Sequence, residues 1–211
     1  MWLEHELLSK PGIPGFFCIT TSYRNEPNPI PGRHELIFPM FEFETHGDQR
    51  ELQKLETELL EFIGLGKLEN FVEMEYAAAA SHCESHEIHS AEEARLGNEF
   101  GPVFFLKNFP IYTSPFWNMR KEGDVARKID VLLYGVETIG SAERSCDPVQ
   151  MRELFHTISD GGYAKLLYEK FGRERVEAEL EKFLALNFFP RCGGGIGITR
   201  MIRAFKLAGI L

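Results

Sequence analysis

Two stretches near the start of the chain have the composition and period of β-strands. Residues 16–23 are apolar and β-branched, and residues 38–45 alternate between the two faces of a strand. One face of the second stretch combines apolar side chains with two carboxylates, and the other is aromatic: Phe38, Met40, Glu42 and Glu44 against Phe41 and Phe43. The pattern predicts an antiparallel hairpin with a long connection, from Arg24 to Ile37, of a length typical of functional loops.

Several later segments follow the helical period. Asp48 and Glu51 have the spacing of a capping box, as do Ser90 and Glu93, and Asp147 precedes a proline at a first helical position. The apolar stripe expected on the first of these helices is Leu52, Leu55, Leu59, Phe62 and Ile63. Further helices are expected over 76–81, 163–171, 176–186 and 200–207, and further strands over 102–106, 129–134 and 196–198.

These elements do not alternate strictly between strand and helix, which argues against a doubly wound parallel sheet. They predict an α+β fold in which helices flank an antiparallel β-sheet. Glycine and proline cluster in three short places, and none is long enough for a flexible linker between domains. We therefore expect a single domain over residues 1–211.

Composition argues against two classes of protein, dedicated nucleic-acid modules and membrane-spanning proteins. The chain has 23 Lys and Arg against 32 Asp and Glu, a net charge of −9, whereas a dedicated nucleic-acid module usually has a basic surplus. No apolar run of about 18 residues is present, so no membrane span is expected. The four cysteines lack CxxC spacing, which indicates reduced thiols and a cytoplasmic protein.

A glycine-rich run near the C-terminus, Gly193-Gly194-Gly195-Ile196-Gly197, is followed by Arg200. Glycines at alternate positions of a strand leave a flat floor that a planar ring can approach closely. An arginine at the start of the next helix can stack on an aromatic base or bind phosphate. The run is neither a Walker loop nor G-x-G-x-x-G, and by itself it is equally compatible with a tight turn before a solvated arginine.

The hairpin contains a second set of candidates, Tyr23-Arg24-Asn25-Glu26 followed by His34 and Phe38. An arginine here can hold an α-phosphate, a carboxylate can accept a hydrogen bond from a base amine, and a ring can stack on a purine. A surface Arg–Glu pair and a core phenylalanine would give the same pattern. The hairpin residues alone are therefore weak evidence.

A third set is Asp130, Glu137 and Arg144. The two carboxylates flank the end of a predicted strand, an arrangement that suits Mg²⁺ bound together with ATP phosphates. Arg144 is a candidate for bidentate binding of a carboxylate. The alternative interpretation of all three is a solvated strand edge.

Taken together, these motifs resemble those of class II aminoacyl-tRNA synthetases in order and separation. The hairpin from Tyr23 through His34 and Phe38 to Glu42 resembles motif 2, and the glycine run ending at Arg200 resembles motif 3. The segments 110–119, 130–144 and 147–155 resemble the aspartate and asparagine subgroup. The resemblance extends over nearly the whole chain and implies the catalytic fold of that family.

The resemblance also implies roles at the nucleotide. Arg24 would bind the ATP α-phosphate and the attacking carboxylate, and Glu26 would contact the adenine amine. His34 would lie near the terminal phosphates, and Phe38 and Arg200 would sandwich the adenine. The floor beneath the nucleotide would be formed by Gly195 and Gly197.

For the amino acid and the metal, the implied roles fall on four residues. Glu42 would bind the α-ammonium group, and Arg144 would read the substrate side chain. Glu137, helped by Asp130, would ligate Mg²⁺. The implied reaction is attack of the amino-acid carboxylate on the α-phosphorus of ATP, which gives an aminoacyl-adenylate and pyrophosphate. Aspartate or asparagine is the expected amino acid.

The sequence also departs from the family pattern. Motif 1, which forms the family's dimer interface, has no counterpart, and neither has an anticodon-binding domain. Thr199 replaces the usual acidic residue before the motif 3 arginine, as a small hydroxyl residue does in ammonia-dependent asparagine synthetase. These differences favour a stand-alone synthetase-like ligase, with tRNA as an uncertain partner and dimerisation in doubt. The alternatives are a non-catalytic module that binds ATP or a partner protein, and a catalytic part of an asparaginyl- or aspartyl-tRNA synthetase.

Overall fold

The computed structural model describes residues 2–25, 29 and 35–211. Its core is an eight-stranded sheet with the strand order β1-β2-β8-β7-β6-β4-β3, in which β5 pairs with β6. All pairs are antiparallel except β3 and β4, which run parallel at one edge. The strands are β1 Gly15–Tyr23, β2 Ile37–His46, β3 Val72–Glu75, β4 Val103–Pro110, β5 Lys121–Glu122, β6 Val125–Leu133, β7 Val136–Glu143 and β8 Arg191–Gly197.

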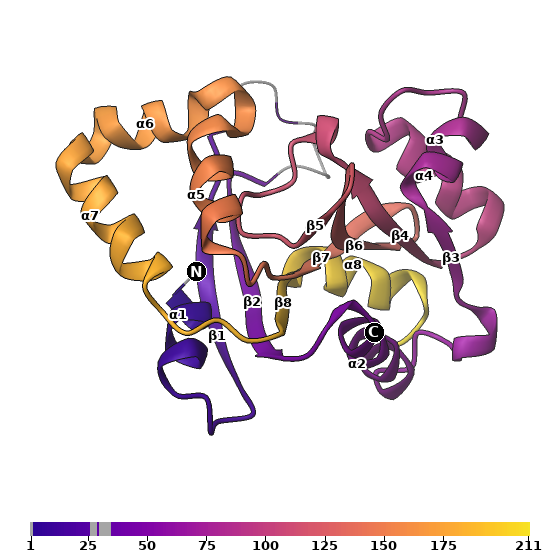
Figure 1. The fold of residues 1–211 in the computed structure, drawn as a ribbon. Helices are drawn as coiled ribbons and strands as arrows, with labels where there is room; N and C mark the ends of the chain where they lie inside the picture. Colours follow the sequence, from indigo (N-terminus) through magenta and orange to yellow (C-terminus); the bar gives the residue numbers. More distant parts are fainter. Residues whose placement is uncertain (1, 26–28, 30–34) are drawn as a thin grey trace.

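Helices gather at both ends of this sheet and on one of its faces (Figure 1). The helices are α1 Trp2–Ser9, α2 Gln49–Phe62, α3 Tyr76–His82, α4 Ser90–Phe100, α5 Pro148–Thr157, α6 Gly162–Phe171, α7 Arg173–Leu184 and α8 Ile198–Leu207, with 3-10 turns at Leu68–Asn70, Ile111–Thr113 and Ile158–Gly161. The main core lies between α2, α8 and the sheet, and two smaller cores lie under α5–α7 and under α3–α4. The predicted α+β class is confirmed, and the parallel β3–β4 pair is the one departure from an antiparallel sheet.

The hairpin forms as its alternation predicts. Tyr23 pairs with Ile37, so the long connection lies between these residues. The face that carries Glu42 looks into a cavity, and Phe41 and Phe43 pack against the main core on the opposite face. That opposite face also carries exposed apolar side chains from β1, and Phe17 stacks on Phe41 with ring centroids 5.4 Å apart.

The helix starts agree with the sequence in two of three cases. Asp48 and Glu51 form a capping box at α2, and Asp147 caps α5 ahead of Pro148. The expected capping box at Ser90 is wrong, because the cap of α4 is His89 and its backbone N–H donates to Glu92. Glu93 instead accepts a hydrogen bond from the backbone N–H of Glu137, which ties α4 to β7.

The apolar stripe expected on α2 is also partly wrong. Leu55 and Phe62 are exposed, whereas Glu56 is only 1% exposed and lies in the row of Leu52 and Leu60. Neither carboxylate oxygen of Glu56 makes a hydrogen bond of good geometry to the described residues, although the hydroxyl of Ser141 lies close enough to lower the pKa of Glu56 slightly. Burial raises the pKa of Glu56 from 4.5 to about 8, because the charged form is poorly solvated there.

This buried carboxyl predicts a stability that depends on pH. The unfolded chain releases the Glu56 proton near pH 4.5 and the folded chain near pH 8, so the folded state binds more protons in between. The free energy of unfolding should therefore fall as pH rises through this window, by roughly 2–5 kcal/mol in total. In Glu56→Gln this fall should be smaller, with a remainder caused by other buried carboxyls such as Asp130, whose pKa burial also raises, and the variant should be more stable than the parent at pH 8. Urea unfolding at pH 5, 6.5 and 8 tests this, and equal slopes in both proteins would contradict it.

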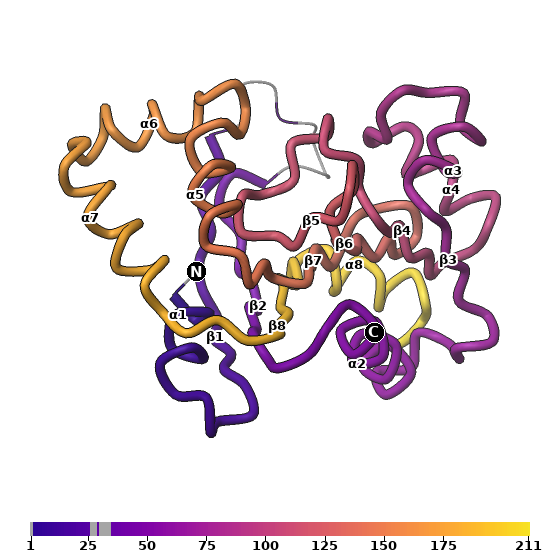
Figure 2. The backbone as a smooth tube through the Cα atoms, in the orientation of Figure 1, coloured from indigo at the N-terminus to yellow at the C-terminus, as the bar shows by residue number. Residues whose placement is uncertain are grey.

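The N-terminal helix α1 lies against the segment that leads into strand β8. Figure 2 shows α1 beside the segment that leads from α7 into β8. Glu4 and Arg191 form an ion pair of 2.6 Å there, with both side chains 0% exposed. The amide of Asn118 donates a further hydrogen bond of 2.8 Å to Glu4. This network fixes α1 against β8, next to the cavity.

Candidate active site

One large cavity, of about 1080 Å³, opens on the face of the sheet opposite the main core. Its walls come from α1, β1, β2, β7, β8 and α8, which are distant in the sequence but adjacent in the fold. Eight residues predicted from the sequence line it: Arg24, Phe38, Glu42, Glu137, Arg144, Gly195, Gly197 and Arg200. Glu26 and His34 lie outside the described residues, so their predicted roles stay predictions.

Strand alternation explains how the hairpin supplies its part of the wall. Thr20 and Ser22 of β1 face the cavity beside Met40 and Phe38 of β2, with which they are paired. The hydroxyl of Thr20 donates a hydrogen bond of 2.7 Å to Oε2 of Glu42. Glu42 therefore has a fixed orientation toward the cavity, and no cation among the described residues pairs with it, which leaves its charge available to a cationic group.

The glycine run forms strand β8 in the middle of the sheet. Gly195 is paired with Glu42 on one side and with Gly140 on the other. A Cβ at Gly195 would lie 2.5 Å from Cε of Met40, whereas one at Gly194 would lie 2.6 Å from the carbonyl oxygen of Gly140. The glycines therefore remove side chains from the cavity floor and also let β7 and β8 approach closely. The strand predicted over 196–198 is observed as β8, Arg191–Gly197, which begins earlier and is longer.

These two neighbouring glycines allow a matched test. In Gly195→Ala the new methyl group enters the cavity and displaces only the end of a flexible methionine, so folding should be retained while nucleotide binding weakens. In Gly194→Ala it collides with the backbone of β7, which should cost about 1–3 kcal/mol of stability. Thermal melts with and without ATP compare the two variants. Equal loss of stability in both would argue against this division of roles.

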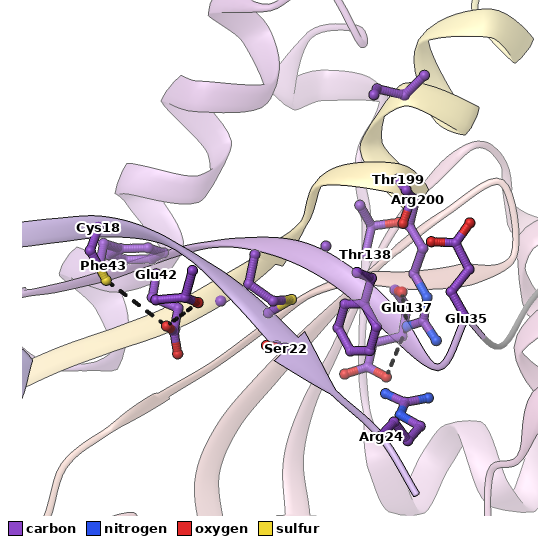
Figure 3. A pocket seen from close by; sticks show the side chains of 18 of the residues that line it. Cys18, Ser22, Arg24, Glu35, Glu42, Phe43, Glu137, Thr138, Thr199 and Arg200 are labelled. Carbon is purple, nitrogen blue, oxygen red and sulfur yellow. Dashed lines mark hydrogen bonds and ion pairs between the residues drawn. The ribbon is translucent and has the colours of Figure 1, made fainter. Parts of the chain in front are cut away.

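At one end of the cavity lie the side chains expected to bind nucleotide (Figure 3). The guanidinium of Arg24 lies 5.3 Å from the ring centroid of Phe38, so it covers the ring that was expected to stack on adenine. Nη1 of Arg200 donates a hydrogen bond of 2.5 Å to the carbonyl oxygen of Glu137 and lies 3.6 Å from its carboxylate. Arg200 is therefore paired with Glu137 here, and the predicted sandwich with Phe38 requires both arginines to rearrange around a ligand.

The two predicted metal ligands both lie near Gly140. A Cβ at this glycine would lie 2.9 Å from Oε1 of Glu137 and 3.5 Å from Oδ1 of Asp130. Glu137 lines the cavity, but Asp130 is buried behind it and its other oxygen pairs with Lys128 at 2.5 Å. Burial raises the pKa of Asp130, opposed by Lys128 and reinforced by the charge of Glu137, and Oδ1 has no hydrogen-bond partner within the described chain.

Arg144 lies at the other end of the cavity and is not free. Its Nε donates a hydrogen bond of 2.9 Å to Oε1 of Glu44, and its Nη2 contacts the same oxygen. The sequence placed Glu44 on the correct face of its strand but gave it no role. Burial raises the pKa of Glu44, while the positive charge of Arg144 opposes this. The partners Glu4 and Arg191 were not predicted either, because nothing in the pattern of a short helix reveals a buried glutamate.

Comparison with known proteins agrees with this arrangement. A family model described as tRNA synthetases class II (D, K and N) matches residues 2–207. The chain belongs to this family. The hairpin, the glycine strand and the arginine at the start of α8 are thus parts of a class II synthetase catalytic fold.

Individual relatives of this class II chain are distant. It is 29% identical over 106 residues to an aspartate–tRNA(Asp) ligase of Pyrobaculum aerophilum, a match that covers 50% of this chain and 22% of the relative. An aspartyl-tRNA synthetase from Entamoeba histolytica has a TM-score of 0.75 at 16% identity, covering 99% of this chain and 48% of that one.

An asparaginyl-tRNA synthetase from Pyrococcus horikoshii, in complex with asparaginyl-adenylate, has a TM-score of 0.74 at 22% identity, covering 98% of this chain and 52% of that one. The chain thus spans about half the length of these synthetase structures. Within the described residues of the class II chain, no helix is long and apolar enough to cross a membrane.

Proposed function

We propose that this class II synthetase chain is a single catalytic domain that activates aspartate or asparagine with ATP, releasing pyrophosphate and forming an aminoacyl-adenylate. The observation that supports this is convergence: Arg24, Glu42, Glu137, Arg144 and Arg200 come from separate elements and line one cavity with a glycine floor. A cavity of about 1080 Å³ is at the upper end of the usual range for small-molecule sites and has room for a nucleotide beside an amino acid.

In the proposed reaction an oxygen of the amino-acid carboxylate forms a bond to the α-phosphorus, and the bond from that phosphorus to the bridging oxygen breaks. Pyrophosphate leaves with the electron pair. Arg24 binds the α-phosphate and the attacking carboxylate, and Glu42 binds the α-ammonium group. Phe38 supplies a stacking surface for the adenine, and Arg200 the opposite surface once it leaves Glu137. Catalysis then consists of alignment and charge neutralisation, so no side-chain nucleophile is required.

The residues at Gly140 fit a magnesium ion that is shared with the nucleotide. The unpartnered Oδ1 of Asp130 and the Oε1 of Glu137 face the same gap, where a Cβ would otherwise lie. Mg²⁺ is commonly held by one or two carboxylates together with phosphate oxygens and water. When bound, it would neutralise charge on the phosphates. Glu137 is the ligand exposed to the cavity, and Asp130 supports it from behind.

The direct test is amino-acid-dependent ATP–pyrophosphate exchange by the full chain, without tRNA, across all twenty amino acids. We expect exchange with aspartate or asparagine and with no other. Glu42→Gln should raise the KM for the amino acid while ATP still raises the melting temperature. Absence of exchange with every amino acid, together with stabilisation by ATP, would instead support a module that only binds nucleotide.

A second assay identifies the acceptor of the activated amino acid. Thr199 lines the cavity. It is the small hydroxyl residue before the motif 3 arginine, the feature that this chain shares with ammonia-dependent asparagine synthetase. We therefore propose a stand-alone cytoplasmic ligase that transfers to ammonia or another amine. Release of asparagine from aspartate, ATP and ammonium would support this. Formation of aminoacyl-tRNA in its place would identify a tRNA ligase.

A further inference from the structure

A second cavity, of about 290 Å³, lies among the helices α5, α6 and α7, at the side of the sheet remote from α3 and α4 (Figure 1). We call it the α5–α7 cavity. In the part of the chain that the structure describes, it shares no lining residue with the cavity that forms the candidate active site. An apolar cavity of about 150 Å³ is enough to bind benzene, so this one has room for two fused rings.

Aromatic rings form much of the wall of the α5–α7 cavity. Trp117 is 1% exposed and meets Phe155 and Phe183 edge to face, with ring centroids 5.5 and 5.8 Å apart. Phe155 meets Tyr163 in the same way, at 5.5 Å. Rings packed against one another present flat apolar surfaces, which favour a flat aromatic ligand through stacked and edge-to-face contacts.

One hydroxyl in this wall is available to a ligand. Burial raises the pKa of Tyr163, and the nearby indole N–H of Trp117 opposes this rise. That buried indole nitrogen makes no hydrogen bond of good geometry to the described residues. Because an indole nitrogen can only donate, the Tyr163 oxygen is the acceptor of the two, and no described residue accepts the hydroxyl proton of Tyr163. The cavity thus combines apolar walls with one hydroxyl donor.

The charge at the opening of the cavity is positive. Arg175 and Glu179 are the only charged residues that line it within the described chain, and both are exposed. Glu179 forms an ion pair of 3.2 Å with Lys182. Arg175 forms no ion pair with any described residue, and its guanidinium lies 5.8 Å from the ring centroid of Phe171. An anionic group at the opening would therefore meet a cation that the protein does not itself neutralise.

We propose that the α5–α7 cavity is a second ligand site, which takes a flat aromatic carboxylate of one or two fused rings with a hydrogen-bond acceptor at its inner end. The ring lies against Trp117, the acceptor receives the hydroxyl proton of Tyr163, and the carboxylate stays at the opening beside Arg175. There the carboxylate keeps most of its water, so little desolvation opposes binding. The proposal does not depend on the proposed function, since no residue of the active-site cavity takes part.

Three compounds of one shape separate these contributions. Quinoline-6-carboxylate carries both the ring nitrogen and the charge, naphthalene-2-carboxylate lacks the nitrogen, and quinoline-6-carboxamide lacks the charge. Each is titrated into the full chain at pH 7.5 and followed by NMR of the ligand. Quinoline-6-carboxylate should bind with a Kd of about 1 mM or tighter, as ordinary ligand efficiency gives for its size. The other two should bind about threefold more weakly, the effect of one hydrogen bond or one exposed ion pair. Absence of binding, or equal binding of all three, would overturn the proposal.

A matched pair of variants locates the site. Leu167 lines the cavity, whereas its neighbour Leu166 is 53% exposed and outside the lining. Leu167→Trp fills the cavity and should weaken binding of quinoline-6-carboxylate at least about tenfold, whereas Leu166→Trp should leave it unchanged. Saturating ATP should also leave it unchanged. Binding that ATP abolishes and Leu167→Trp leaves intact would place the compound in the active-site cavity and overturn the proposal.

Tyr163→Phe keeps the test decisive if Leu167→Trp does not fold. It removes only the hydroxyl, so quinoline-6-carboxylate should lose its advantage over naphthalene-2-carboxylate. Persistence of that advantage in the folded variant would overturn the role of Tyr163. Neither result depends on ATP–pyrophosphate exchange, so failure of this proposal and failure of the proposed function can be told apart.

Discussion

Glu4→Ala is expected to lower the free energy of unfolding by about 3–5 kcal/mol, the largest single effect that the structure predicts on stability. The substitution leaves the guanidinium of Arg191 charged, fully buried and without its carboxylate partner. It also removes the acceptor for the amide of Asn118. Most of this loss of stability comes from leaving a buried charge unpaired, since an intact buried ion pair contributes little net stability.

Urea unfolding of the parent and the variant measures this difference. Glu6→Ala provides a control on the same helix, because Glu6 makes its ion pairs near the surface, with Lys10 at 2.6 Å and with His5 at 4.0 Å. Such pairs contribute about 0.3–0.5 kcal/mol. A loss of similar, small size in both variants would show that the Glu4–Arg191 pair does not hold α1 to β8.

Arg24→Ala is expected to reduce amino-acid-dependent ATP–pyrophosphate exchange by about 10²–10³-fold, the range measured when one preorganised donor is removed from charge developing in a transition state. Arg24 lies in the cavity over Phe38, where its guanidinium can reach a ligand stacked on that ring. Arg24→Lys keeps the charge but loses the forked geometry, so it should recover only part of the activity.

The control for this second prediction is Arg50→Ala. Arg50 is exposed on α2 and does not line the cavity, so exchange should stay at the parent rate. Melting temperatures of all three variants separate loss of activity from loss of folding. Retention of full exchange by a folded Arg24→Ala protein would rule out the proposed contact with the α-phosphate.

The parts of the fold that follow a simple period could be predicted from the sequence. The hairpin alternates every second residue over a long stretch, and Asp48 and Asp147 cap their helices through local contacts. Strand β7 was not predicted, because it is buried on both faces and contains Thr138, Gly140 and Ser141 in place of large apolar residues. Its burial is decided by β6 and β8, which pair with it from either side.

Part of the candidate site could also be predicted from the sequence, because its residues stand in motifs of fixed spacing. Eight residues recognised by the spacing of family motifs line the cavity, whereas Asp130 is buried outside its lining and Glu26 and His34 lie outside the described residues. Glu44 and Arg191 were missed because their roles depend on contacts across the fold. The partner of Glu44 is a hundred residues away in the chain, and no local pattern indicates such a contact.

The uncharged strand β1 has a consequence for the behaviour of the protein in concentrated solution. Within the described chain β1 pairs only with β2, so its other edge presents free backbone N–H and C=O groups. Its sequence, GFFCITTSY, contains neither a charged residue nor a proline, and these are the features by which natural edge strands resist joining one another. Long-range repulsion between molecules of net charge −9 then provides the remaining colloidal protection. That repulsion disappears at the isoelectric point, near pH 5.3, where edge-to-edge aggregation should be fastest.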